Sequence, residues 1–433
     1  MSVTPGALAA VIAAAVMVPS AGSAPDRPTP SASALAGLAQ AAASGQGAAA
    51  DHAVAQLREA GPAGLAALLA AEPRGPRWSA AVDAVAAQKD AAATGLYWYT
   101  DLERAKAAAR AGGRPILSLH LLGRLDREAS CANSRFFRTV LYANEDVGRA
   151  LRERFVLHWE SVRPVPRVTI DLGDGRRLAG TVAGNSIHYV LDSEGRVVDG
   201  LPGLYGPQAF LRVLGEAEHT ARAASGLDGP GFSLYRAAHH RLALAAMGAD
   251  GIEVPRLALP VSAPGRRPSA DQAGRLARTK ALAEVPLLRG LSRSPADAAA
   301  LGEAAGAERA AAARFAAECR LDARSRAIVV AKQRSWARAA GVAAPDEAAI
   351  VAGVERSLAA DTARNETVLR PRLRAWFARG EAPATASALD DRVYAELFLT
   401  PASDPWLGLV DPTAFAALDP LAVQQQQLAA PRP

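Results

Sequence analysis

The sequence has few cysteines and few aromatic residues. Only Cys131 and Cys319 occur among 433 residues, which excludes a disulfide framework and any Cys-rich metal or cluster site built by one chain. The two cysteines are far apart in the sequence, and a disulfide requires α-carbons within about 7 Å of each other. We therefore do not expect Cys319 to pair with Cys131.

Positive charge is not gathered in one part of the chain. The 49 Lys and Arg residues exceed the 43 Asp and Glu residues by a formal charge of +6, but they are scattered, and aromatic residues supply only 5%. A nucleic-acid groove needs basic residues on one face, so no nucleic-acid partner is expected. Phosphate loops, dinucleotide fingerprints and paired-carboxylate motifs are also absent from the sequence, and it predicts neither a cofactor nor a metal.

Long hydrophobic runs are missing as well. The apolar stretch Gly6–Val18 is too short to predict a stable membrane span. It is followed by small residues, with Ala21 and Ser23 at a small-x-small cleavage site, although no Lys or Arg precedes it. We interpret residues 1–24 as a signal peptide and expect export to the periplasm or the extracellular space. The alternative is a flexible, Ala-rich N-terminus of a cytosolic protein.

Half of the residues are hydrophobic, so the chain can bury more than one core. Residues 25–95 read as a linker and an Ala-rich helical segment, with short helices at His52–Ala60 and Pro62–Ala71. From residue 226 to 400 strand signals almost vanish and an all-α region is predicted. Its expected helices are Leu234–Met247, Asp271–Ala283, Ala296–Leu321, Arg324–Ala340, Asp346–Ala360 and Asn365–Arg379.

The chain ends in a Pro- and Trp-containing tail at 401–433. The aromatic residues around it, Phe398 and Trp406, either pack onto the core or form a docking surface. We favour packing, because apolar side chains are usually buried.

Between residues 97 and 217 the pattern is different, since strands alternate with helices. A helix is predicted at 101–111, capped by Thr100 and ended by Gly112-Gly113. A mixed α/β sandwich is the expected result. The remaining elements are strands at Pro115–Leu119 and Phe155–Val162, helices at Cys131–Tyr142, Glu145–Arg154 and Pro207–Ala217, and hairpins at Val168–Leu178 and Ile187–Val198.

The order of Trp98, the helix 101–111, the run Arg114-Pro115-Ile116-Leu117 and a cysteine that opens a helix carries a family resemblance. It resembles the thioredoxin-like proteins, whose motif runs W…A-K…K-P-I-L…W-C-x-x-C. The resemblance implies an α/β thioredoxin-like domain at 97–217, flanked by a small N-terminal helical segment and a larger C-terminal all-α region.

Under this resemblance the motif C-x-x-C becomes Cys131-Ala132-Asn133-Ser134. Cys131 and Ser134 are then the candidate catalytic residues, with Asn133 and Arg135 in support. A helix N-terminus and nearby Arg side chains stabilise a thiolate, and the Ser134 hydroxyl could donate a hydrogen bond to it.

Three departures from the family pattern affect this site. The resolving thiol is replaced by Ser134, so turnover would need an external thiol or Cys319. The family's cis-proline aligns with Ser186, our further supporting residue. The loop between Leu119 and Cys131 is long and lacks the tryptophan that usually precedes the cysteine.

Two functions follow from these features. The first is single-thiol exchange with a low-molecular-weight thiol or a protein partner; the second is a non-catalytic scaffold or protein-interaction module. A hydrolase pair of Cys131 and His188 is a third alternative, but no orienting acid or oxyanion motif accompanies it.

The other histidines are not expected to act. His120 and His158 are expected to be core or rim histidines with satisfied hydrogen bonds, as is His188 if it does not pair with Cys131. His239 and His240 are adjacent on one helix, so they point to different faces and are expected at the surface, not as joint metal ligands.

Overall fold

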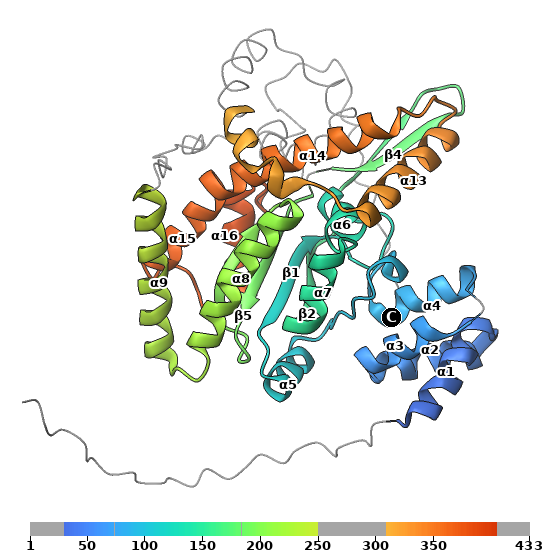
Figure 1. The fold of residues 1–433 in the computed structure, drawn as a ribbon, viewed down its shortest axis with the longest axis horizontal. Coiled ribbons are helices and arrows are strands. Elements are labelled where there is room, and N and C mark those ends of the chain that lie inside the picture. Colours follow the sequence, from blue (N-terminus) through green and yellow to red (C-terminus); the bar gives the residue numbers. More distant parts are fainter. Residues whose placement is uncertain (1–29, 73, 183, 250–308, 405–433) are drawn as a thin grey trace, which may run out of the picture.

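The computed structural model describes residues 30–72, 74–182, 184–249 and 309–404, and within them the protein is a mixed α/β structure rich in helices (Figure 1). The predicted signal peptide, the helix Asp271–Ala283 and Trp406 lie outside the described residues, as does the first part of the predicted helix Ala296–Leu321. The described part of that helix ends before Leu321, in the short 3-10 turn Ala317–Cys319.

A four-stranded mixed sheet lies at the centre, in the order β2-β1-β5-β6. Strand β1 is parallel to β2 and antiparallel to β5, which in turn pairs with β6 in antiparallel fashion. Every residue of β1, β5 and β6 is buried, so both faces of the sheet are covered and the strands are nearly continuous apolar runs. The strands are β1 (Ile116–Leu122), β2 (Val156–Arg163), β5 (Ser186–Leu191) and β6 (Val197–Pro202).

Tyr99 pairs with the free edge of strand β2. Its backbone N–H donates to the carbonyl of Leu157 at 2.8 Å, and its carbonyl accepts from Trp159 at 3.1 Å. A short parallel bridge therefore satisfies main-chain groups that an edge strand would otherwise present to water.

The helices around the sheet follow the predicted order, with two local differences. Asp101 caps the first helix instead of Thr100, because its carboxylate accepts from the Arg104 N–H at 3.0 Å. The predicted helix Cys131–Tyr142 is divided into a short α-helix and a π-helical turn. These elements are α5 (Leu102–Gly112), α6 (Ala132–Phe136), η2 (Phe137–Leu141), α7 (Glu145–Arg154) and α8 (Pro207–Ala224).

The N-terminal helices form a small core of their own, and Arg58 joins them to Tyr97 and Trp98, in the segment that leads into the α/β unit. Its guanidinium donates to the carbonyls of Val85 at 2.9 Å and Trp98 at 2.5 Å, and its own carbonyl accepts from Tyr97 Oη at 2.8 Å. In Figure 1 this group lies on one side of the sheet. It consists of α1 (Ala32–Ser44), α2 (Gly47–Glu59), α3 (Pro62–Ala70) and α4 (Pro76–Ala86).

The C-terminal helices share the hydrophobic core of the sheet, to which Leu373, Phe377 and Tyr394 belong. Phe398 is buried, as predicted for packing onto the core. Most predicted helices of this region are present. The structure also contains a helix at Ala386–Arg392 that was not predicted, because its polar Asp-Asp-Arg end shows no helical pattern of apolar residues. The described elements are α9 (Gly229–Ala249), η3 (Ala317–Cys319), α13 (Ala323–Ala339), α14 (Glu347–Arg364), η4 (Asn365–Leu369), α15 (Arg370–Ala378), α16 (Ala386–Arg392) and η5 (Val393–Leu397).

The other predicted hairpin projects from this body. Its strands are β3 (Arg167–Asp171) and β4 (Arg177–Thr181), and most of their side chains are partly or fully exposed.

Gly200 permits the close approach of α15 to the sheet. A Cβ atom at this position would lie 2.7 Å from Leu373 Cδ2 and 3.2 Å from Ile187 Cδ1. We expect Gly200→Ala to lower the free energy of unfolding by about 1–3 kcal/mol, because the added methyl group overpacks the core.

Gly353 supplies the matched control. It lies inside α14 with no atom within 4 Å of its Cβ position, and Gly353→Ala should stabilise the protein by about 0.5–1 kcal/mol. Urea unfolding measures both changes, and a Gly200→Ala variant as stable as the parent would contradict the packing described.

Candidate functional site

Cys131 occupies the N-cap position of α6, the place at a helix start that the sequence predicts. Its side chain is 0% exposed, and its Sγ accepts a hydrogen bond from the Ser134 backbone N–H at 3.4 Å. N-caps are usually Ser, Thr, Asp or Asn, whose side chains satisfy a free N–H of the first turn. The thiol of Cys131 performs this structural task.

Ser134 does not use its hydroxyl on the sulfur, in contrast to the prediction. The hydroxyl lies 2.5 Å from Ser130 Oγ and 3.0 Å from the carbonyl oxygen of Cys131. A hydroxyl inside a helix commonly turns back to a carbonyl of the preceding turn. The contact between Ser134 and the sulfur is therefore made by the main chain.

The segment before β5 lies directly on Cys131. A Cβ atom on Gly184 would be 2.3 Å from the Cβ of Cys131, so only glycine fits there. The amide of Asn133 donates to Ser186 Oγ at 3.1 Å, which brings together two of the predicted supporting residues. The sequence analysis aligned the family's cis-proline with Ser186 and gave Gly184 no role. The contact of Gly184 with Cys131 depends on the path of the main chain, which no side-chain pattern reveals.

The two arginines that follow the cysteine differ in position. Arg135 is half-buried, whereas Arg138 is buried, with its Nη1 donating to the carbonyl of Arg127 at 3.1 Å and its Nε 3.8 Å from Asp90 Oδ2. Burial lowers the pKa of Arg138, and the nearby Asp90 carboxylate opposes this effect. Asp90 thus offsets part of the positive charge near the thiol.

His188 is buried and bonded to Tyr142, its Nε2 lying 2.6 Å from the phenol oxygen. Burial lowers the pKa of His188 to about 3 and raises the pKa of Tyr142. An imidazole with such a low pKa is a weak base, so this arrangement does not support a Cys131–His188 ion pair. The Nδ1 atom of His188 has no hydrogen-bond partner among the described residues.

A chain of buried polar groups crosses the opposite face of the sheet. His120 Nδ1 lies 2.7 Å from Asp390 Oδ2, and His120 Nε2 lies 3.0 Å from Ser118 Oγ. Ser118 Oγ is also 2.7 Å from His158 Nδ1, and Tyr189 Oη donates to Asp390 Oδ1 at 3.0 Å. The expectation of a core histidine with both nitrogens bonded is confirmed for His120.

The direction of these hydrogen bonds follows from the carboxylate. An ionised carboxylate can only accept, so His120 donates from Nδ1 to Asp390, and a neutral imidazole then accepts at Nε2 from the Ser118 hydroxyl. His158 then donates from Nδ1 to Ser118, and burial, with the nearby His120, lowers the pKa of His158 to about 3. The order Ser–His–Asp is that of a hydrolase triad, but Ser118 is 0% exposed and offers no access to a substrate.

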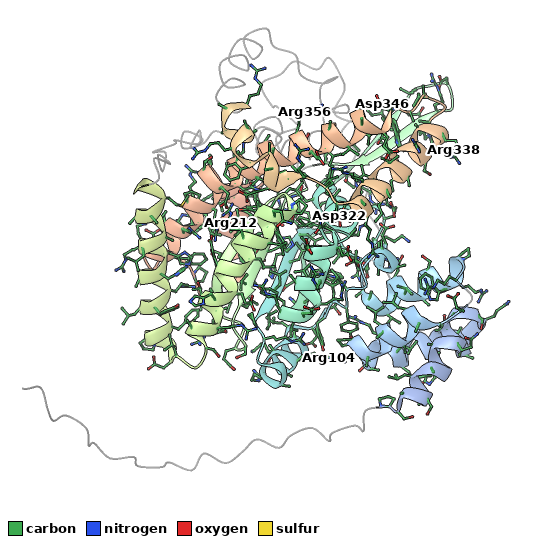
Figure 2. The ribbon with its side chains drawn as sticks, in the orientation of Figure 1. Arg104, Arg212, Asp322, Arg338, Asp346 and Arg356 are labelled. Carbon is green, nitrogen blue, oxygen red and sulfur yellow. The ribbon has the colours of Figure 1, made fainter. Side chains whose placement is uncertain are left out.

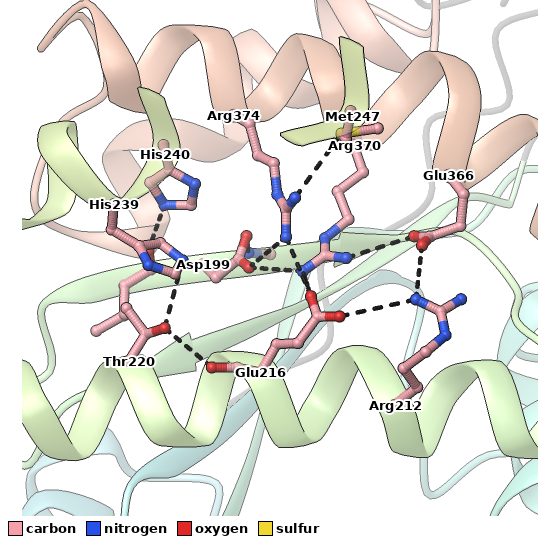
Figure 3. Close-up of polar contacts among 12 residues, drawn as sticks. Asp199, Arg212, Glu216, Thr220, His239, His240, Met247, Glu366, Arg370 and Arg374 are labelled. Carbon is pink, nitrogen blue, oxygen red and sulfur yellow. Dashed lines mark hydrogen bonds and ion pairs between the residues drawn. The ribbon is translucent and has the colours of Figure 1, made fainter. Parts of the chain in front are cut away.

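A second buried cluster, shown in Figure 3, joins the edge strand β6 to the C-terminal helices. Arg370 Nη2 lies 2.9 Å from Asp199 Oδ2 and 3.2 Å from Glu216, while Arg374 lies 3.3 Å from Glu216. Burial alone would raise the pKa of Asp199, but Arg370 and the surrounding positive charges lower it overall. Removing one partner of such a buried pair typically costs about 3–5 kcal/mol.

The prediction that His239 and His240 lie at the surface is wrong for His240. This side chain is 0% exposed, and its Nε2 lies 2.9 Å from the carbonyl oxygen of Val198 on β6. Its helix α9 packs against α15 beside the sheet edge, a contact that no local pattern encodes. His239 is half-buried, with its Nε2 3.3 Å from Thr220 Oγ1.

Cys319 is buried elsewhere and forms no disulfide with Cys131. Its Sγ lies 3.5 Å from Thr362 Oγ1 and presses against Gly206. Burial raises the pKa of Cys319 to about 11, so its thiol stays protonated at neutral pH.

The described ranges contain neither a metal-binding cluster nor a membrane-spanning helix. Within 30–249 and 309–404, apart from residues 73 and 183, no group of three or more His, Cys, Asp or Glu side chains is arranged to hold a metal. No described helix combines the length and apolar character needed to cross a membrane.

Comparisons with protein-family models, curated proteins and solved structures find no match for this chain.

The buried histidines predict a pH dependence of stability. Burial lowers the pKa values of His158 and His188 to about 3 and that of His240 to about 4, whereas unfolded histidine titrates near pH 6.5. Between these values the unfolded state binds more protons, so the free energy of unfolding should fall as the pH drops from about 6.5 towards 4.

Urea unfolding at pH 7, 5 and 4 measures this slope in the parent and in two variants. His188→Gln removes one contributor and should give a shallower slope. His52→Gln, at an exposed position on α2, should leave the slope unchanged. Equal slopes in all three proteins would contradict the assignment of a buried neutral His188.

Proposed function

We propose that residues 97–217 form a thioredoxin-like domain that acts as a non-catalytic scaffold, on which two sets of helices are assembled to bind a protein partner. The observation that carries this proposal is the burial of Cys131, whose Sγ caps a helix and is 0% exposed.

The sheet topology supports the thioredoxin-like part of the proposal. Two parallel strands, β1 and β2, are followed by an antiparallel hairpin, β5 and β6, added on the β1 side. The cysteine opens the first helix after β1, and α8 follows the hairpin. This order of strands and helices supports a thioredoxin-like domain at 97–217.

The thiol geometry supports the non-catalytic part. Thiol–disulfide exchange needs a thiolate that can reach a disulfide sulfur, and access limits its rate. Cys131 has no exposed surface, and Ser134 cannot resolve a mixed disulfide. The resting protein therefore lacks both an accessible nucleophile and a resolving thiol at this site.

The scaffold role is supported by specific polar contacts that hold both sets of helices. Arg58 fixes the N-terminal helices, and the Asp199–Arg370 pair fixes the C-terminal ones. Asp322, labelled in Figure 2, accepts from the N–H groups of Glu145 and Ser325, each at 2.8 Å. One carboxylate thus caps the starts of α7 and α13, which joins the α/β unit to the C-terminal region.

Single-thiol exchange with a low-molecular-weight thiol or a partner's disulfide is our second proposal. It is supported by the position of Cys131 at a helix N-terminus and requires a movement that exposes the sulfur.

For either function we propose export, on the sequence of residues 1–24. N-terminal sequencing of the exported protein should begin near residue 25, and an intact Met1 would contradict export.

The scaffold proposal predicts no disulfide-reductase turnover. The parent should not accelerate reduction of insulin disulfides beyond the rate of its own Cys131→Ser variant. Ser134→Cys, which restores the spacing C-x-x-C, should also remain inactive, because residue 134 is buried with Cys131. Turnover in the parent or in Ser134→Cys that disappears when Cys131 is replaced would overturn the scaffold proposal in favour of exchange.

A further inference from the structure

The C-terminal stretch from Ala386 to Thr400, here called the cover segment, lies across one face of the sheet. It contains α16 and the π-helical turn η5. Its Asp390 accepts hydrogen bonds from His120 on β1 and Tyr189 on β5. The cover segment is thereby fixed to the two central strands through a single carboxylate.

The cover segment also reaches the chain that lies on Cys131. Tyr394 Oη donates to the carbonyl of Asn185 at 3.0 Å, and Asn185 directly follows Gly184, which presses on the cysteine. Burial raises the pKa of Tyr394, and the negative charges of Asp390 and of an ionised Cys131 add to the rise. Tyr394 therefore helps to hold the Gly184–Asn185 segment down on Cys131.

The backbone of the cover segment departs from regular helix at two places. Val393–Leu397 forms a π-helical turn, and Leu399 adopts a positive φ of 53°. Residues other than glycine rarely take such a φ, and a conformation of this kind persists only when surrounding contacts impose it. The contacts that impose it include those of Asp390 and Tyr394 and the bond from Arg163 to the Thr400 carbonyl.

We propose that the cover segment closes the resting protein over Cys131, and that its local release, without unfolding of the sheet, exposes this thiol. The hydrogen bonds of Asp390 and Tyr394 are the two contacts that set how often release occurs. This goes beyond the scaffold role, because a scaffold needs only that the cover segment be bound. Proteins commonly open in such contiguous units at a lower free energy than global unfolding.

Cys319 provides an internal reference for this proposal. It is buried against Gly206 and Thr362, neither of which belongs to the cover segment. Release of the cover segment should therefore expose Cys131 alone, whereas global unfolding exposes both thiols.

The test is alkylation of the full-length native protein by iodoacetamide, with the rate at each cysteine followed by peptide mass spectrometry. Asp390→Asn replaces the charged acceptor of His120 and Tyr189 with a neutral amide of the same shape. Tyr394→Phe removes the bond to Asn185 and keeps the ring. Each variant should label Cys131 about tenfold faster than the parent, which corresponds to a loss of about 1.4 kcal/mol from the closed state.

Leu57→Ala serves as the matched control, since Leu57 is fully buried in the core of the N-terminal helices. It should not raise the Cys131 rate above the Cys319 rate. Faster labelling of Cys131 alone in both cover variants is the expected result. Equal acceleration of alkylation at both cysteines, or no acceleration in either variant, would overturn the proposal that the cover segment closes over Cys131. The alkylation rates do not depend on disulfide-reductase turnover, so this test can fail or succeed independently of the test of the scaffold proposal.

Discussion

The structure depends on the complete burial of three of the four strands of the central sheet. Strands β1, β5 and β6 have no exposed residue, so each polar side chain within them must find a partner inside the protein. His120 and Asp199 find theirs in Asp390 and Arg370, which come from the C-terminal helices. The same helices bury this imidazole and this carboxylate, so loss of the Asp390 or Arg370 side chain alone would leave a buried polar group without that partner, at a cost of several kcal/mol. The α/β unit and the C-terminal region are therefore one body held by shared polar groups.

This constraint decides the environment of the cysteine. The helices that satisfy the sheet also bring Tyr394 onto the Gly184–Asn185 segment, which seals Cys131. A helix N-terminus would favour a thiolate in an exposed site, but here the N–H of Ser134 meets a buried sulfur. The same local feature can thus serve either a reactive thiol or a helix cap, and burial distinguishes the two.

Local patterns predicted much of the fold. The helix Glu145–Arg154 has the predicted bounds, and Cys131 lies at a helix start, because caps and apolar periodicity are encoded within a few residues. The burial of Cys131 could not be read from the sequence, since Gly184 lies on it and the next residue, Asn185, is bonded to Tyr394, more than 250 positions further along the chain. His240 was misplaced for the same reason, because only the packing of α9 reveals its contact with Val198. The direction of a single side chain was also not predictable. Ser134 has the spacing from Cys131 that suits a bond to the thiol, but its hydroxyl is bonded to Ser130.

The most direct measurement of the central claim is the number of thiols that react in the native wild-type protein. With an aromatic disulfide reagent at neutral pH and without denaturant, neither Cys131 nor Cys319 should react at the rate of an exposed thiol. Both should react once the chain is unfolded in guanidinium. A native protein in which Cys131 reacts at once, at a rate that denaturant does not increase, would contradict the account of a sealed, structural cysteine.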